Sequence, residues 1–394
     1  MRTYTVLRDL TDANTGEPFG GAATLGTPDL GSVGLRVDVE RLDKSDVRSL
    51  SRDPEVRAIA PVMPTTLIHP VGEPEDGPTE AAGTAWGVTA VGADRSARTG
   101  AGVVVAVLDT GIDAAHPAFT GVTLTQMDFS GSGNGDKQGH GTHCAGTVLG
   151  RDVDGTRIGV APGIEHALIG KVLGDNGGGD SEMIFRGIQW ALDNHAQVIS
   201  MSLGFDFPGL VKDLVGRGWP ADLATSVALE AYRANLRMFD ALMGVARGRE
   251  PFGGGCVLVA AAGNESRRDV DPDYEIAVSI PAAADGVVSV GALGESAGGL
   301  RVAPFSNTFP QVSGPGVAVL SAKLGGGLTA LSGTSMATPH VAGVAALWWE
   351  ELTRSDVPLS ARATLAKVLA TATTAGLAAD ADPADRGLGL VQAP

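Results

Sequence analysis

Residues 333–343 read GTSMATPHVAG, and this stretch decides the fold by placing Ser335 among small side chains. The apolar run that follows, Val341–Trp349, is typical of a buried helix. Ser335 is therefore expected at or just before a helix N-terminus, where unpaired amides and the positive end of the helix dipole face negative charge. Because serine alone is a poor nucleophile, this interpretation requires a base and an orienting acid elsewhere.

Three further segments supply these partners. Residues 103–113, VVVAVLDTGID, predict a buried strand that ends at Asp109. Residues 139–148, GHGTHCAGTV, place His140 at the start of a small-residue helix. Residues 256–266, CVLVAAAGNES, predict another buried strand, which delivers Asn264 just after a glycine. The order Asp-His-Ser distinguishes this arrangement from the two other frameworks that use the same three residue types.

In this order the four segments resemble a subtilisin-like (S8) serine protease, over about residues 86–394. The resemblance implies a serine endopeptidase that hydrolyses peptide bonds through an acyl-enzyme. Ser335 would attack the scissile carbonyl and His140 would take its proton and pass it on to the leaving amine. Asp109 would orient the imidazole, and Asn264 would bind the oxyanion.

The resemblance also implies where a polypeptide substrate binds. The edge where a substrate strand adds by β-pairing would be Gly177, Gly178 and Gly179. The two walls of the S1 pocket would be Ser202, Leu203 and Gly204 on one side and Ala261, Ala262 and Gly263 on the other. Because these residues are small or apolar, we expect a preference for a large hydrophobic P1 residue, the one before the scissile bond.

Alternating strands and helices predict an α/β fold. Residues 167–173 and 197–203 are strand-like, and residues 183–194 between them are helical. Such alternation implies a doubly wound, mostly parallel sheet with helices on both faces. We expect three parts: a small α+β propeptide-like domain (1–69), a linker with an autoprocessing site (70–85) and a catalytic domain (86–394).

The N-terminal part has its own pattern. Residues 33–39 and 56–62 predict strands, and residues 42–52 predict an amphipathic helix capped by Asp43 or Ser45. This resembles the second half of a subtilisin propeptide, a module that assists folding and inhibits the protease; a small structural domain without a regulatory role is the other interpretation. Residues 70–84 are rich in Pro, Gly and acids, so we predict self-cleavage between about residues 69 and 84.

Residues 205–255 form a longer connection than a minimal family member needs. Within it, residues 222–247 have helical spacing, and the remainder is an insertion beside the expected substrate cleft. Two interpretations stay open: this insertion restricts substrates, or it is a surface elaboration.

Composition limits the partners. The chain has 394 residues, a net charge of −16 and a pI of about 4.8, which disfavours nucleic acid and anionic membranes. No apolar run has the length of a membrane span, and the N-terminus lacks the features of a secretion signal. We therefore expect a cytoplasmic monomer, or a secreted protein if the true start lies upstream. The two cysteines, Cys144 and Cys256, are expected to be buried free thiols.

No cofactor is required by this chemistry, and calcium is left open. Ala118 stands where the best-known calcium site of the family uses an aspartate, and the loop 151–157 does not resemble its ligand loop. Asp152 and Asp154 could still bind a hard cation weakly. The alternative function is a non-catalytic or permanently self-inhibited binding protein of the same fold, in which the N-terminal region never leaves the cleft.

Overall fold

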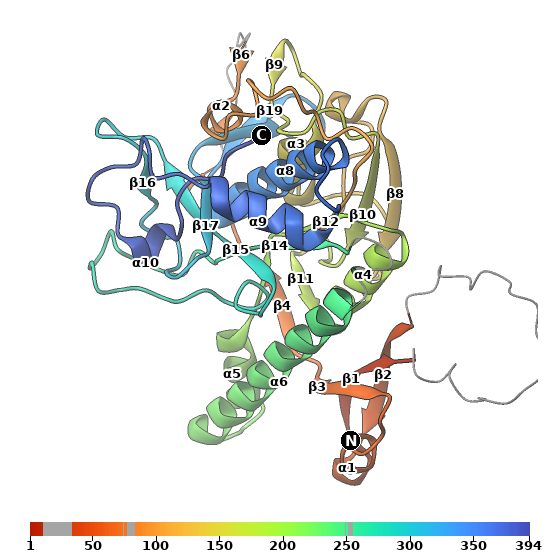
Figure 1. The fold of residues 1–394 in the computed structure, drawn as a ribbon. Helices are drawn as coiled ribbons and strands as arrows, with labels where there is room; N and C mark the ends of the chain where they lie inside the picture. The colour runs from red at the N-terminus through yellow and green to blue at the C-terminus, as the bar shows by residue number, and fades with distance from the viewer. Residues whose placement is uncertain (11–33, 74, 77–82, 249, 251–254) are drawn as a thin grey trace, which may run out of the picture.

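A computed structural model describes residues 1–10, 34–73, 75–76, 83–248, 250 and 255–394. Its centre is a large sheet in which neighbouring strands are mostly parallel, as the sequence predicted (Figure 1). The antiparallel exception is the edge strand β16, and β17 (Val312–Pro315) pairs with β15 off the main order. In spatial order the strands are β16 (Arg301–Val302), β15 (Val287–Gly294), β14 (Val257–Ala261), β12 (Val198–Met201), β7 (Val104–Asp109), β10 (His166–Lys171) and β8 (Thr123–Asp128).

Helices cover both faces of this sheet. The alternation of side chains along β7 sends Val105 and Val107 into one apolar core and Ala106 and Leu108 into another. The first core is shared with α3 (His140–Leu149), α8 (Thr334–Thr353) and α9 (Ala361–Thr371). The second is shared with α4 (Ser181–Asp193) and α6 (Ala221–Gly248). Burial on both faces explains why these strands read as continuous apolar runs.

The N-terminal region forms a separate antiparallel sheet in the order β2-β1-β3, with one helix. Its elements are β1 (Arg2–Asp9), β2 (Leu35–Leu42), α1 (Lys44–Leu50) and β3 (Val56–Pro61). Asp43 caps α1 through a capping box with Asp46, so Asp43 rather than Ser45 is the cap. The sequence analysis missed β1, which is the central strand.

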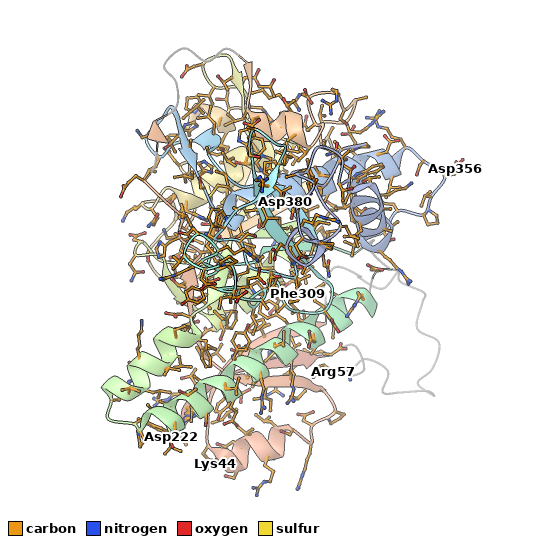
Figure 2. The ribbon with its side chains drawn as sticks, turned by 90° about the vertical axis from the view of Figure 1, so that its left-hand side faces the viewer. Lys44, Arg57, Asp222, Phe309, Asp356 and Asp380 are labelled. Carbon is orange, nitrogen blue, oxygen red and sulfur yellow. The ribbon has the colours of Figure 1, made fainter. Side chains whose placement is uncertain are left out.

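This small sheet packs directly on α4 and α6. The side chain of Asn235 on α6 donates to Pro61 O at 2.9 Å, and Val37 N donates to Gln189 Oε1 on α4 at 2.9 Å. Apolar residues of β1 and β2 belong to the same core as α4 and α6. Figure 2 shows the region that carries Lys44 and Arg57 beside α6, whose first turn carries Asp222.

The connection over 205–255 is more helical than predicted, because α5 (Phe207–Gly216) precedes α6. Asp206 accepts from Gly209 N at 2.7 Å, and Pro208 lies in the first turn, so this segment has a regular helix start. The two helices pack on each other, and α6 also contacts β3. The described part of the insertion therefore supports the N-terminal region.

A short three-stranded sheet joins the N-terminal region to the cleft. Its middle strand is β4 (Pro64–Leu67), between β11 (Gly178–Asp180) and β13 (Leu203–Phe205).

The remaining elements are β5 (Glu75–Asp76), β6 (Gly83–Thr84), α2 (Trp86–Ala90), the 3-10 helix η2 (Pro117–Phe119), β9 (Thr156–Arg157), β18 (Val319–Ala322), β19 (Leu328–Leu331) and α10 (Pro383–Arg386). Within the described ranges, no helix is both long and apolar enough to cross a bilayer. Cys144 and Cys256 are buried free thiols.

Candidate active site

Asp109 and His140 meet at the carboxyl end of β7. Asp109 is the last residue of that strand and His140 the first of α3, and both are 1% exposed. His140 Nδ1 lies 2.8 Å from Asp109 Oδ1, and the same oxygen accepts from Thr110 N at 2.7 Å. Gly139, with φ 89°, supplies the left-handed turn that starts the helix at this point.

The electrostatics of this pair favour a protonated imidazole. Burial lowers the pKa of His140, but the Asp109 carboxylate outweighs burial and raises the pKa well above its ordinary value. The other ring nitrogen, Nε2, is buried and has no hydrogen-bond partner among the described residues. It is therefore free to exchange a proton with a group brought beside it.

Ser335 is the second residue of α8 and is completely buried. Its hydroxyl donates to the carbonyl oxygen of Ile68 at 3.0 Å, which directs the hydroxyl hydrogen toward the N-terminal chain. The residue thus lies at a helix start, as predicted from the small residues around it. The first turn of α8 leaves amides available for an anion formed next to Ser335.

Asn264 follows β14, and its side chain lies beside the start of α8, next to Ser335. Its Nδ2 donates to the carbonyl oxygen of His69 at 2.9 Å. Its Oδ1 accepts from both the amide and the hydroxyl of Thr334, at 2.9 and 2.8 Å. Because Thr334 precedes Ser335, these two bonds fix the Asn264 amide relative to the serine.

The segment 64–71, which begins with the strand β4, crosses this site, and we refer to it as the strap. β4 pairs antiparallel with β11, where Thr66 lies opposite Gly178, and with β13, where Thr66 lies opposite Gly204. Leu67 N donates to Gly177 O at 2.9 Å, and beyond the site Val71 N donates to Ser332 O at 2.7 Å. The predicted substrate edge, Gly177 to Gly179, and the predicted wall residues Leu203 and Gly204 therefore flank this strand.

Ile68 is buried in the strap, 4% exposed, as are Thr65 and Leu67, whereas the next residue, His69, is exposed. A Cβ atom added to Gly204 would lie 3.5 and 3.7 Å from two carbons of Ile68 and 3.6 Å from Ser279 Oγ. The Ser279 hydroxyl is buried and has no partner among the described residues. Ile68 thus fills a pocket beside Gly204.

The other predicted wall residues lie close to the serine. Ser202 Oγ donates to Ser335 O at 3.0 Å, and Gly263 N donates to Thr334 Oγ1 at 3.2 Å. Ala261 and Ala262 are completely buried at the end of β14. The predicted substrate-binding residues with printed hydrogen bonds therefore lie along the strap or next to Thr334 and Ser335.

The other histidines of the two motifs, His143 and His340, contact backbone carbonyls. His143 Nε2 lies 3.0 Å from Val319 O, and burial lowers its pKa to about 3. His340 Nδ1 lies 2.8 Å from Met336 O, and burial lowers its pKa to about 4. Both rings are neutral at ordinary pH.

Sequence reasoning missed the strap and the carboxylate of Asp136. The strap had a usable signal in residues 64–68, PTTLI, a β-favouring run ahead of Pro70. Asp136 lies four residues before His140 and accepts five hydrogen bonds. No contiguous motif marks this role.

The loop 151–157, where calcium was left open, carries two arginines whose side chains bind nearby backbone carbonyls. The guanidinium of Arg157 donates to the carbonyls of Ala93 and Gly159, at 3.0 and 3.3 Å. That of Arg151 donates to the carbonyls of Leu149, Pro162 and Ile164. These are backbone oxygens of the kind that a hard cation would need, and here each already faces a positive charge.

Among the described residues, the one cluster of three metal-ligating side chains is Asp109, His140 and Cys144. In it, Asp109 and His140 are already hydrogen-bonded to each other, and Cys144 Sγ lies 3.7 Å from His140 Nδ1. The cluster is therefore the acid–imidazole pair with a thiol beneath it.

Comparison with known proteins agrees with this geometry. Residues 100–389 match the profile of the subtilase family, peptidase S8. The chain is 33% identical over 311 residues to a thermostable alkaline protease of Halalkalibacterium halodurans, covering 78% of this chain and 70% of that protein. It is 34% identical to subtilisin DY of Bacillus licheniformis (66% of this chain, 83% of that one) and to an intracellular serine protease of Paenibacillus polymyxa (63% and 67%).

Proposed function

Because the chain belongs to the subtilase family and is a subtilisin-like serine endopeptidase, we propose that it cleaves polypeptides through Asp109, His140 and Ser335. Ser335 Oγ attacks the scissile carbonyl carbon, and His140 Nε2 takes the hydroxyl proton. The same nitrogen then returns the proton to the leaving amine, which leaves an acyl-enzyme that water hydrolyses. Asp109 holds the Nδ1–H and stabilises the imidazolium.

The oxyanion is assigned to Asn264, together with the backbone amide of Ser335. The support is the bond from Asn264 Nδ2 to a strap carbonyl at 2.9 Å, beside the serine. Its Oδ1 is already tied to Thr334, so the donor is oriented before charge develops. Such preorganisation is what makes an oxyanion donor effective.

The observation that carries the proposal is the strap itself. An extended piece of backbone lies antiparallel between β11 and β13 and brings two carbonyls onto Ser335 and Asn264. A peptide substrate would need the same pairing, because main-chain hydrogen bonds give affinity to a strand added at a sheet edge. The cleft therefore has the shape and polarity of a peptide-binding site.

We assign the strap an inhibitory role. Ser335 donates to the carbonyl of Ile68 while Asn264 donates to the carbonyl of the next residue, His69. The nucleophile and the oxyanion donor thus engage different peptide units, and neither unit is arranged for attack. The hydroxyl is turned toward Ile68 O, and His140 Nε2 has no partner among the described residues.

Release of the strap is proposed to occur by self-cleavage between about residues 69 and 84. The two carbonyls at the serine belong to Ile68 and His69, at the N-terminal edge of this window, part of which (74 and 77–82) lies outside the described residues. N-terminal sequencing of purified protein tests this. A new N-terminus in the window, absent in Ser335→Ala, is expected, and a persistently full-length wild type would contradict it.

The division into residues 1–69, 70–85 and 86–394 stays part of this proposal. A large hydrophobic residue before the scissile bond is the proposed preference, and it is supported by Ile68 in the pocket beside Gly204. A peptide-library cleavage profile of the processed enzyme tests both the activity and the preference. Cleavage after aliphatic or aromatic residues, lost in Ser335→Ala, is expected; cleavage after charged residues would contradict the preference.

We propose that calcium is not needed at the loop 151–157, because the guanidinium groups of its Arg151 and Arg157 bind the neighbouring backbone carbonyls. Excess chelator should leave the melting temperature of the protein unchanged. Arg157→Ala should lower it by several degrees, since buried carbonyls lose their donors at about 1–3 kcal/mol each. Arg95→Ala, whose side chain is 66% exposed, is the control. A chelator-induced fall in melting temperature would contradict the proposal.

An intracellular location and a monomeric state remain proposals. The first is supported by two relatives that are named as intracellular serine proteases, from Paenibacillus polymyxa and Bacillus subtilis. The alternative of permanent self-inhibition is favoured by one observation, the hydrogen bond from the nucleophile to the strap. It predicts a full-length chain that never gains activity, which distinguishes it from the self-cleaving enzyme.

A further inference from the structure

Asp136 is a buried carboxylate that the chemistry above does not use. It lies in the loop before α3, is 8% exposed, and both its oxygens are saturated with donors. Oδ1 accepts from Gln138 N and Gly139 N, each at 2.9 Å, and from the hydroxyl of Thr110 at 3.0 Å. Oδ2 accepts from the amide and the hydroxyl of Thr142, at 2.9 and 2.6 Å.

Two of these donors come from the motifs that carry Asp109 and His140. Thr110 directly follows Asp109, and Thr142 lies two residues after His140. Each hydroxyl donates to Asp136 and accepts a backbone amide from the opposite element. Thr110 Oγ1 accepts from Gly141 N at 2.9 Å, and Thr142 Oγ1 accepts from Asp113 N at 2.9 Å.

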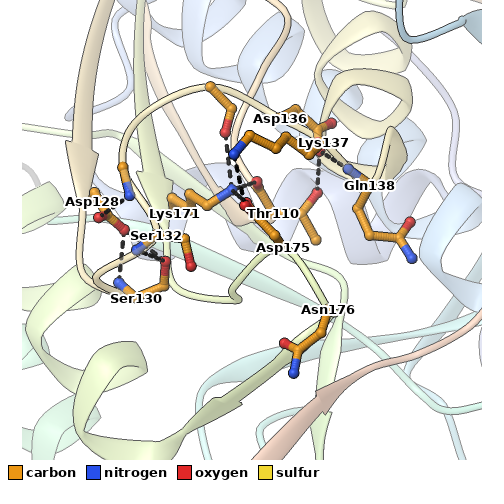
Figure 3. Close-up of polar contacts among 12 residues, drawn as sticks. Thr110, Asp128, Ser130, Ser132, Asp136, Lys137, Gln138, Lys171, Asp175 and Asn176 are labelled. Carbon is orange, nitrogen blue, oxygen red and sulfur yellow. Dashed lines mark hydrogen bonds and ion pairs between the residues drawn. The ribbon is translucent and has the colours of Figure 1, made fainter.

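The result is a reciprocal clasp, defined by Asp136, Thr110 and Thr142 (Figure 3 shows Asp136 and Thr110). It joins the turn after β7 to the first turn of α3. The two elements are in close contact, since a Cβ on Gly141 would lie 2.2 Å from Gly111 O. Glycine at both positions lets the backbones approach closely enough for the hydroxyls to reach across.

A buried lysine supports the clasp. Lys171, 2% exposed, donates to the carbonyls of Thr110 and Gly135 at 2.8 and 3.0 Å and to Asp175 Oδ1 at 2.8 Å. Figure 3 shows Lys171 beside Thr110 and Asp175. The lysine thus holds the residue before Asp136 and the residue after Asp109 together. The β7 side of the clasp and the loop that carries Asp136 are thus held by the same cation.

We propose that Asp136 is a positioning residue that sets the geometry between Asp109 and His140, acting through the hydroxyls of Thr110 and Thr142. The inference rests on the proposed function, because it matters only if His140 transfers a proton while Asp109 orients its ring. A helix cap alone would need only the bonds to Gln138, Gly139 and the Thr142 amide. The two hydroxyl relays instead connect the elements that carry the acid and the imidazole.

The test compares two conservative variants of Thr142, one without and one with the hydroxyl. Thr142→Val keeps the shape of the side chain and removes the hydroxyl, whereas Thr142→Ser keeps the hydroxyl. We expect Thr142→Val and Asp136→Asn to lower kcat by about 10- to 100-fold with KM changed less than twofold, since small misplacements of catalytic groups cost rates of this order. Thr142→Ser should retain kcat. All proteins are compared at one chain length, verified by mass.

Two further readouts exclude a general loss of folding. Rates are expressed per active site titrated with a fluorophosphonate, and the proton resonance of the Asp109–His140 hydrogen bond is followed in the same variants. We expect this resonance to shift or broaden in Thr142→Val but not in Thr142→Ser. Thr110→Val should repeat the effect from the other element. The double variant Asp136→Asn/Thr142→Val should be less than additive in log kcat.

The inference is overturned if Thr142→Val and Thr110→Val keep wild-type kcat per titrated site, or if Thr142→Ser is as defective as Thr142→Val. Failure of the proposed function gives a different result. In that case wild type itself would not be labelled at Ser335, and wild type and Ser335→Ala would show the same level of peptide cleavage.

Discussion

The two halves of the active site are held in different ways. Around Asp109 and His140 the contacts are internal, because the acid–imidazole bond of 2.8 Å is surrounded by hydrogen bonds from the same domain. Around Ser335 and Asn264 the contacts go to the strap, through bonds to Ile68 and His69. The proposed proton-transfer pair is thus held by residues of its own part of the chain, whereas the proposed nucleophile is engaged by a segment that is proposed to leave.

The strongest test of the serine half is Ser335→Ala. Peptide hydrolysis should fall to background, a loss on the order of 10⁶ in kcat, which is the scale found for the nucleophile of a subtilisin. The protein should remain full-length if cleavage of the strap depends on Ser335. Ser355→Ala, an exposed serine after α8, is the control and should keep its activity. Residual hydrolysis near the wild-type rate would remove Ser335 from the mechanism.

Asn264→Ala tests the donor opposite the serine. We expect kcat to fall by about 10²–10³ with little change in KM, because the donor acts on charge that develops in the transition state. Steady-state kinetics on a peptide substrate measure this. Asn194→Ala, an exposed amide at the end of α4, is the matched control. A rise in KM with kcat unchanged would show that Asn264 binds the ground state instead.

Ile68→Asp should loosen the strap without touching the catalytic residues. Burial of an isoleucine side chain contributes about 1.5–3 kcal/mol, so a charged residue in its pocket should raise the activity of the full-length chain by about tenfold or more. Initial rates on a small peptide ester measure the effect. Val71→Asp is the control, since Val71 is 42% exposed on the same strap. Equal activity of wild type and Ile68→Asp would mean that the strap does not inhibit.

The Asp109–His140 half of the site can be tested by measuring how activity depends on pH. The Asp109 carboxylate raises the pKa of His140 above its ordinary 6.5, and a protonated imidazole cannot accept the serine proton. Activity should therefore be lost as pH falls through a midpoint above 6.5 in the kcat/KM profile of the processed enzyme. Asp152→Asn, which changes an exposed carboxylate, should leave this midpoint in place. A midpoint below 6.5 would contradict the assigned environment.

The sequence was sufficient to propose the residues of the site. Asp109, His140, Asn264 and Ser335 each lie in a contiguous motif at the end of an apolar strand or the start of a small-residue helix. Their positions at one edge of the sheet follow from parallel topology. The structure joins Asp109 to His140, and Asn264 to Thr334, the residue before Ser335; their shared catalytic role stays a proposal.

What could not be predicted depends on pairing between distant segments. The register of the strap is set by contacts of Thr66 with Gly178 and Gly204, more than a hundred residues away. The central strand β1 was missed because its pairing partners, β2 and β3, define it more than its own pattern does. The clasp of Asp136 joins two motifs through hydroxyl groups, and no local periodicity reports such a contact.

The most direct measurement is the rate at which a fluorophosphonate labels Ser335, compared between the full-length chain and Ile68→Asp, with Ser335→Ala as the blank. The account predicts slow labelling of the full-length chain, labelling at least tenfold faster once the Ile68 pocket is disrupted, and none in Ser335→Ala. Equal rates in the first two proteins would contradict the inhibitory strap, and labelling in Ser335→Ala would contradict the nucleophile itself.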